Sequence, residues 1–343
     1  MTQPQTLTNA APAGAPVPFA EIWRGPFLES VHMGHAVVCD TQGEIVMAWG
    51  DPHAVVLPRS SSKMLQGLPL IESGAADAAG LTDAQLALAC ASHQGAAIHT
   101  SRVAAWLEHL GKSESDLRCG VQPAADVPEA ERLIRAGESA CQLHNNCSGK
   151  HAGFLTLNAH LGGGSEYVEA DHPVQKAALE AFEDLTGADS YGYAIDGCSA
   201  PNHATTVHCM ARAMAYFAGA KTGSNTRQNA AARLRDAICA YPELVAGEGR
   251  ACTELMRAMD GRVAIKTGAE AYYVAILPEK GLGVALKVVD GSTRGAECAI
   301  AAILVKLGVL DANHPATRKR MNAPIRNWRG IETGILRPAA ALA

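Results

Sequence analysis

The chain has 343 residues, of which 48% are hydrophobic and 18% are charged, a composition typical of a globular enzyme with a large buried core. Its formal net charge of -5 comes without any block rich in lysine and arginine, which argues against nucleic acid or an anionic membrane as a partner. The expected partner is a small neutral or zwitterionic molecule.

The two ends and the cysteines indicate where the protein works. Residues 1–18 lack the cationic start and the apolar run of a secretory signal, and we predict a flexible leader there. No later stretch reaches the roughly 18 consecutive apolar residues that a membrane helix needs. The 10 cysteines are scattered and form no CxxC pair, so most are expected to be reduced thiols. These features predict a soluble, cytoplasmic protein.

The predicted elements change character along the chain. Residues 27–49 alternate apolar and polar side chains around a glycine-containing turn, which predicts a β-hairpin. Residues 60–247 are rich in alanine and leucine with helical spacing, so this region is expected to be mostly helical. Residues 262–290 contain three β-type runs separated by turns and predict a meander. A closing helix follows, and the Pro/Arg-rich tail from Asp311 is expected to wrap over the surface.

Strands at both ends with helices between them predict an α+β fold. It would contain one antiparallel β-sheet built from the N-terminal hairpin and the C-terminal meander, flanked by helices and carrying a large helical insert. The two ends of the chain would then lie near each other. No internal repeat or Ser/Gly linker divides the chain, so residues 19–343 are expected to form a single catalytic domain.

A serine and a lysine stand three residues apart at the start of the first predicted helix. The spacing of Ser60 and Lys63 places both side chains on one helical face, where a neutral lysine could accept the seryl proton. The pattern alone is weak, because a serine at a helix start is more often an N-cap. Its partner in serine β-lactamases and penicillin-binding proteins, Lys-Thr-Gly, occurs twice. The copy at 221–223 is expected in a solvated loop, whereas the copy at 266–268 ends a β-type run.

The order of hairpin, S-x-x-K helix, helical region, K-T-G strand and terminal helix resembles the serine β-lactamase and glutaminase superfamily, with its penicillin-binding-protein-like fold. Two features of that superfamily are missing. The sequence contains no S-D-N tripeptide, and no acidic residue is placed as the deacylation base of a β-lactamase. Activity on β-lactams is therefore not expected.

Three motifs are more specific: CASHQG at 90–95, HNNCSGKHAG at 144–153 and DGCSAPN at 196–202. They resemble the bacterial class 3 (rhizobial-type) L-asparaginases, and the likeness runs from about residue 30 to residue 308. This resemblance implies two Ser-Lys pairs in the active site, with one of the serines as nucleophile. The pairs would be Ser60 with Lys63 and Ser92 with Lys266, and the nucleophile would be Ser60.

The resemblance also implies a zinc ion and a homodimer. The zinc ligands would be Cys147, Lys150 and Cys198. Spacing alone would never propose Lys150, because a lysine must lose its proton before it binds a metal. Without the resemblance, the two cysteines would more often be buried thiols. The zinc is expected to order the surrounding loop and tune affinity, while hydrolysis is left to serine.

The expected reaction is hydrolysis of L-asparagine to aspartate and ammonia. Recognition of a free amino acid needs a cation for its α-carboxylate and an acceptor for its ammonium group. Arg59 is the candidate for the first role, and Asp196, with Glu270 behind it, for the second.

Three other residues are substrate-binding candidates: His93, His151 and Cys252. Alternatively, these residues are structural: the two histidines would be hydrogen-bonded near the core, and the thiol of the cysteine would pack within a helix interface. A glutaminase, another serine amidase or esterase of the same fold, and a non-catalytic amino-acid sensor remain alternative functions.

Overall fold

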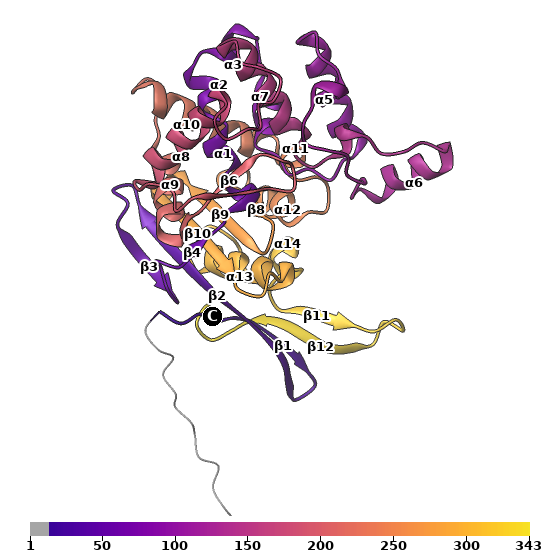
Figure 1. Ribbon diagram of the computed structural model, residues 1–343. Coiled ribbons are helices and arrows are strands. Elements are labelled where there is room, and N and C mark those ends of the chain that lie inside the picture. Colours follow the sequence, from indigo (N-terminus) through magenta and orange to yellow (C-terminus); the bar gives the residue numbers. More distant parts are fainter. Residues whose placement is uncertain (1–13) are drawn as a thin grey trace, which may run out of the picture.

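Within residues 14–343, which the computed structural model describes, eight strands form one antiparallel sheet in the order β11-β12-β1-β2-β10-β9-β8, with β3 paired to β2 (Figure 1). The strands of this sheet are β1 (Val17–Arg24), β2 (Phe27–Asp40), β3 (Ile45–Trp49), β8 (Ala264–Gly268), β9 (Tyr272–Leu277), β10 (Leu282–Val288), β11 (Ala323–Arg326) and β12 (Glu332–Pro338). The hairpin β2–β3 and the meander β8–β9–β10 confirm the sheet predicted from the two ends of the sequence.

Strand β2 organises the sheet because it changes partner along its length. Its first half pairs with β1, and its second half pairs with β3 on the same side, while β10 runs along its other edge. The change occurs at Gly34, where a Cβ atom would lie 2.5 Å from the ring of Phe19 and 2.7 Å from the carbonyl oxygen of Lys287. Only glycine allows the backbones to approach so closely at this point.

The tail after Asp311 was wrongly expected to wrap over the surface. It forms the hairpin β11–β12 instead, and β12 pairs with β1 in the register Ala20↔Pro338. An edge strand tolerates a proline, as β11 does at Pro324, because its outer N–H groups need no partner. The pairing of β1 with β12 brings the two ends of the described part of the chain together. Strand β1 begins at Val17, inside the predicted leader, whose first thirteen residues lie outside the described part.

The region between the hairpin and the meander is mostly helical, as predicted. Its helices are α1 (Lys63–Gln66), α2 (Leu68–Glu72), α3 (Ala75–Ala78), α4 (Asp83–Ala89), α5 (Ala97–His109), α6 (Val127–Ala136), α7 (Ser148–Leu161), α8 (Pro173–Thr186), α9 (Val207–Gly219), α10 (Thr226–Ala240), α11 (Pro242–Val245) and α12 (Ala251–Ala258). Two more helices, α13 (Thr293–Lys306) and α14 (Pro315–Arg318), follow the meander. Short strands interrupt the mostly helical region: β4 (Val55–Val56), β5 (Tyr193–Ile195), β6 (Pro201–His203) and β7 (Thr205–Thr206). No helix in the described part of the chain is long and apolar enough to cross a membrane.

Helices cover both faces of the sheet. Helix α9 packs on β2, β9 and β10, and its backbone lies so close to Gly283 that a Cβ atom there would be 2.0 Å from the nitrogen of Ala215. Helix α13 packs on β1 and β12 and contacts His32 through Gly295. On β2, His32 contacts α13, and Cys39 pairs with Gly283, which lies against α9. These two residues of β2 are an odd number of positions apart, so their side chains point to opposite faces of the sheet.

The helical region meets the sheet at its edge strand β8. The 3-10 helix η1 (Arg59–Ser62), which continues into α1, packs directly against β8. A Cβ atom on Gly268 would lie 2.5 Å from the carbonyl oxygen of Pro58 and 3.2 Å from the nitrogen of Ser61. The glycine of Lys-Thr-Gly thus lets the strand that carries Lys266 lie against the segment that carries Ser60.

Candidate active site

Ser60 differs from the two serines that follow it. The hydroxyl of Ser61 donates to the carbonyl of Pro58 over 2.6 Å, and that of Ser62 donates to the carbonyl of Arg59 over 2.9 Å. The Ser60 hydroxyl makes no hydrogen bond with any residue in the described part of the chain, and it opens into a cavity. Arg59, just before it, has a left-handed backbone with φ of 52°, an unfavourable conformation that is typical of functional turns.

Two buried lysines converge on a second serine. Lys266 Nζ donates to Ser92 Oγ over 2.7 Å and to the carbonyl of Thr267 over 2.8 Å. Lys63 Nζ donates to the same Ser92 Oγ over 3.0 Å and also to the carbonyl of Ala91. Each lysine is only 1% exposed. The structure therefore brings Lys63, Ser92 and Lys266 into one hydrogen-bonded cluster, although these residues come from three distant parts of the chain.

Burial of the Lys266 amine, together with the nearby charge of Lys63, lowers the pKa of Lys266 to about 7. Both effects disfavour the ammonium form, because burial removes the water that would solvate the charge and the Lys63 charge repels it. A lysine with this pKa is substantially neutral at neutral pH. It can then accept the proton of the Ser92 hydroxyl, which is what a general base must do.

The cavity at Ser60 has two lobes. The lobe that we call the Arg250 lobe has a volume of about 180 Å³ and is lined by Ser60, Ser92, Asn146, Arg250, Thr267, Gly268, Ala269, Glu270, Ala271, Tyr273 and Thr293. The cysteine lobe has a volume of about 250 Å³ and is lined by Arg59, Ser60, Val121, Gln122, Asn145, Asn146, Cys147, Asp196, Gly197, Cys198 and Ala269. The lobes share Ser60, Asn146 and Ala269, so the Ser60 hydroxyl stands between them.

Two backbone donors lie at the junction of the lobes. The N–H groups of Ser60 and Ala269 have no acceptor among residues 14–343, and both residues line both lobes. The first is free because it lies in the first turn of η1, and the second because it follows the last residue of β8. Such a pair can bind a negatively charged oxygen that develops beside Ser60.

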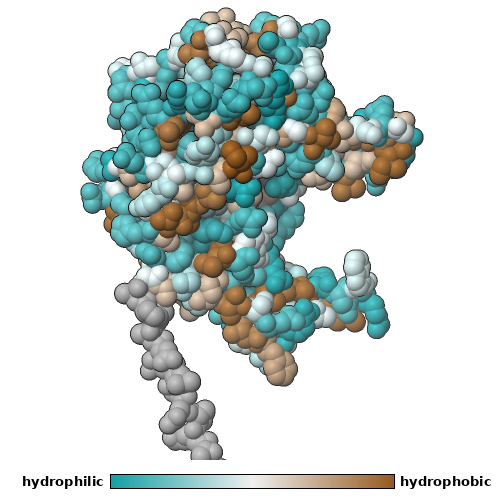
Figure 2. Space-filling model, viewed as in Figure 1, coloured by the Kyte–Doolittle hydropathy of each residue, from teal (hydrophilic) through white to brown (hydrophobic). Residues whose placement is uncertain are grey.

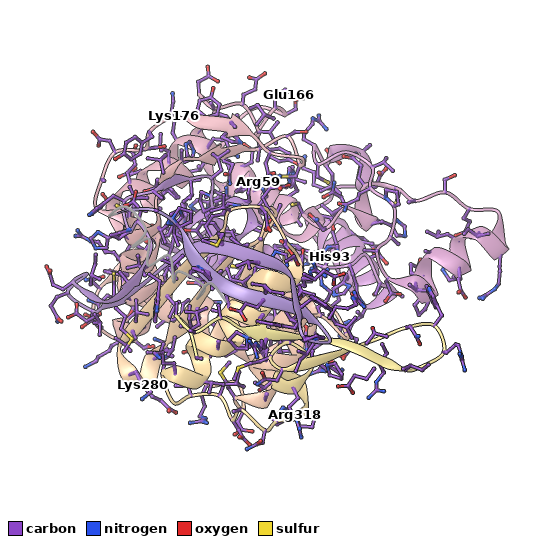
Figure 3. The ribbon with its side chains drawn as sticks, turned by 90° about the horizontal axis from the view of Figure 1, so that it is seen from below. Arg59, His93, Glu166, Lys176, Lys280 and Arg318 are labelled. Carbon is purple, nitrogen blue, oxygen red and sulfur yellow. The ribbon has the colours of Figure 1, made fainter. Side chains whose placement is uncertain are left out.

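An ion pair closes part of the cysteine lobe. Arg59 donates to Asp196 Oδ1 through Nε over 2.9 Å and through Nη2 over 2.7 Å, and the backbone N–H of Gly197 donates to the same oxygen over 2.7 Å. Figure 3 shows Arg59 within the body of the molecule, whereas Glu166, Lys176, Lys280 and Arg318 lie around its rim. The two residues predicted to bind the α-carboxylate and the α-ammonium group of the substrate are thus bound to each other.

The three residues predicted to bind zinc lie together at the base of the cysteine lobe. Lys150 Nζ donates to Cys198 Sγ over 3.0 Å, and Cys147 Sγ lies 2.9 Å from Asn146 Oδ1. A hydrogen bond from Cys147 and the charge of Lys150 hold the pKa of Cys198 well below its usual range. The thiolate is the form that binds a metal. The described residues contain no group of three or more His, Cys, Asp or Glu side chains that could hold a metal ion. A metal at this site would therefore need a lysine as its third ligand.

Of the other candidates, only Glu270 lines the cavity. His93 is buried: its Nδ1 accepts from the N–H of Gly95 over 3.1 Å, and its Nε2 lies 3.0 Å from Ser148 Oγ. His151 contacts the hydroxyl of Tyr167 over 2.9 Å, and Cys252 is 1% exposed. These three residues are buried and do not line the cavity. Asn146 and Arg250 also line the cavity, although they were not predicted as site residues from the sequence.

Solved structures with similar folds are distant in sequence. A β-lactamase from Mycobacterium bovis is 14% identical with a TM-score of 0.46, and the match covers 87% of this chain and 97% of that protein. Mglu in its native form is 15% identical with a TM-score of 0.43, covering 82% of this chain and 66% of that protein. A penicillin-binding protein homolog from Caulobacter crescentus is 11% identical with a TM-score of 0.35, covering 78% and 90%.

Comparison with curated proteins gave no significant match. The model of one protein family, described as L-asparaginase II, matches residues 20–338. That span includes the whole sheet except the first three residues of β1, together with the Ser60 segment, the Lys63–Ser92–Lys266 cluster and both lobes of the cavity. The chain therefore belongs to the L-asparaginase II family.

Proposed function

We propose that this protein hydrolyses the side-chain amide of L-asparagine to aspartate and ammonia through an acyl-enzyme on Ser60. The observation that supports this most is the cluster of Lys63, Ser92 and Lys266, whose central hydroxyl opens into the same cavity as the Ser60 hydroxyl. A binding protein has no need for two buried amines on one hydroxyl beside a free serine. Membership of the L-asparaginase II family supports an amidohydrolase.

The proposed reaction begins with attack of Ser60 Oγ on the amide carbon. A proton shift from Lys63 through Ser92 to Lys266 leaves the Lys63 amine able to accept the proton of Ser60. The N–H groups of Ser60 and Ala269 hold the oxyanion, and each such donor contributes about 3 kcal/mol. Lys63 then returns the proton to the leaving ammonia. Water then attacks the acyl-enzyme, and Lys63 takes the proton of the water and returns it to Ser60.

The size of the Arg250 lobe favours a free amino acid over a longer substrate. At about 180 Å³ the Arg250 lobe is smaller than the roughly 300 Å³ at which drug-sized ligand pockets begin. One extra methylene changes binding by only about 1 to 3 kcal/mol, so glutaminase activity is the second candidate.

Ammonia release from L-asparagine and L-glutamine, measured beside hydrolysis of a chromogenic β-lactam, tests the proposal. We expect turnover of asparagine above that of glutamine and none of the β-lactam. Turnover of the β-lactam without ammonia release from either amide would overturn the proposed function.

We further propose that Cys147, Lys150 and Cys198 hold a zinc ion, which would order the cysteine lobe and tune its affinity for the substrate. The donor set fits, because Lys150 Nζ and Cys198 Sγ are 3.0 Å apart and both sulfurs are buried, and Lys150 would release its proton when it binds the metal. Cys198→Ser should weaken zinc binding about 100-fold or more, whereas Cys209→Ser on helix α9 should leave it unchanged. Elemental analysis and a competitive zinc chelator measure this. Equal zinc content in wild type and Cys198→Ser would contradict the assignment.

We also propose that the protein is a homodimer. The hairpins β1–β2 and β11–β12 project from the body and carry apolar side chains, which Figure 2 shows as brown atoms. Phe27 is 73% exposed and Trp328 is fully exposed, an unusual state for large apolar side chains at neighbouring hairpin tips. The double change of Phe27 and Trp328 to serine should turn a dimer into a monomer in light scattering. A monomeric wild type would refute the proposal.

A further inference from the structure

The Arg250 lobe contains a cation that forms no ion pair with the described residues. The side chain of Arg250 makes no hydrogen bond or ion pair with any residue between 14 and 343, although it is half-buried beside Ser60 and Ser92. Its charge reaches the reactive cluster, since it contributes to lowering the pKa of Lys266. A half-buried guanidinium is costly unless an anion binds it. An unpaired arginine in a cavity therefore indicates a place for an anionic group of a ligand.

Arg59, the other arginine of the cavity, is placed differently. Its Nε and Nη2 both donate to Asp196 Oδ1, and this ion pair lies mainly within the cysteine lobe. A substrate carboxylate at Arg59 would have to compete with Asp196 for the guanidinium. A carboxylate at Arg250 would displace no ion pair formed by the described residues.

The same lobe contains a carboxylate on a strained turn. Glu270 and Ala271, between β8 and β9, have left-handed backbones with φ of 58° and 59°. This conformation is unfavourable for residues with a Cβ and is found mostly where a site requires it. Lys287 Nζ donates to the backbone carbonyl of Glu270, so it fixes the turn without an ion pair to the carboxylate. A Cβ atom on Gly291 would lie 2.8 Å from Glu270 Oε2, so glycine there leaves room for the carboxylate.

We propose that the Arg250 lobe binds the α-carbon end of the substrate, with Arg250 on the α-carboxylate and Glu270 on the α-ammonium group. An α-amino acid carries both charges on one carbon, and this lobe supplies one receptor for each. The side-chain amide then extends toward Ser60 and the N–H groups of Ser60 and Ala269. This inference rests on the proposed function, and it replaces Arg59 with Arg250 as the carboxylate anchor.

Substrates that lack one charge test each contact separately. 3-Aminopropanamide is asparagine without its α-carboxylate, and succinamate is asparagine without its α-ammonium group. Arg250→Gln should lower kcat/KM for asparagine about 100-fold, mostly through KM, and change that for 3-aminopropanamide less than about threefold. Glu270→Gln should lower kcat/KM for asparagine and leave that for succinamate nearly unchanged. Arg257→Gln is the matched control, because Arg257 lies on helix α12, which Arg250 precedes as its N-cap, and pairs with Glu248 at the surface.

The outcomes separate this inference from the proposed function. If Arg59→Gln abolishes the preference for asparagine over 3-aminopropanamide while Arg250→Gln preserves it, Arg59 is the anchor and the inference is wrong. If the wild type releases ammonia from none of these amides, the proposed function fails. Calorimetry with L-aspartate then decides the role of the lobe. Binding that is lost in Arg250→Gln and kept in Arg257→Gln supports the inference, and binding unchanged by Arg250→Gln, or absent from the wild type, overturns it.

Discussion

Replacement of Ser60 by alanine is expected to lower kcat for asparagine by roughly 10⁴-fold or more, because no acyl-enzyme can form without its hydroxyl. The fold should survive, since this hydroxyl makes no hydrogen bond with residues 14–343. Binding of aspartate should be nearly unchanged, because the charged groups of the cavity remain. Ammonia release measured with a coupled assay, beside calorimetric binding of aspartate, separates loss of chemistry from loss of binding.

Ser62→Ala is the matched control for Ser60→Ala. Ser62 is buried two residues away, and its hydroxyl donates to the carbonyl of Arg59 outside the cavity lining. We expect it to cost about 1 kcal/mol of stability and little activity. Near-normal ammonia release by Ser60→Ala would assign the nucleophile elsewhere, and Ser92→Ala would then be the variant to compare.

The central strands and helices could be predicted because their patterns are local. The alternation of β2 and the three runs of the meander are visible in the sequence, and so is the spacing of the helical region. Strands β1 and β12 were missed because they pair with each other from opposite ends of the chain and each carries a proline, at Pro18 and Pro338. Their pairing joins residues more than 300 positions apart, and no local pattern encodes it.

The site residues also fall into two groups, those with a local sequence pattern and those that only the fold brings together. The spacing of Ser60 and Lys63 is local and could be recognised from the sequence. The convergence of Lys266 and Ser92 depends on how β8 packs, and only the family resemblance indicated it. Arg250 carried no sequence signal at all, because the lack of a partner is a property of three-dimensional neighbours. The ion pair of Arg59 with Asp196 was hidden for the same reason, since 137 positions separate them.

Replacement of Lys266 by methionine is expected to lower kcat about 10³-fold, the usual contribution of a general base. The wild-type kcat/KM should rise with pH through about 7, because only neutral Lys266 accepts the Ser92 proton. The remaining activity of Lys266→Met should lack that rise. Lys221→Met is the control, because Lys221 belongs to the second Lys-Thr-Gly, which lies in an exposed turn after α9. An unchanged pH profile in Lys266→Met would show that another group controls the reaction.

The same substitution should stabilise the fold, which distinguishes loss of a base from misfolding. Folding lowers the pKa of Lys266 from 10.5 to about 7, a change that corresponds to about 5 kcal/mol at most. Between these values the unfolded chain binds a proton that the folded protein does not, so the free energy of unfolding rises with pH across this window. Below pH 7 the full cost of the buried ammonium remains. Urea unfolding at pH 6 and pH 9 should therefore show Lys266→Met more stable than wild type at pH 6, with a smaller difference at pH 9. A difference that is equal at both pH values would mean that Lys266 is not neutral in the folded protein at pH 9, and the proton path through Ser92 would lose its acceptor.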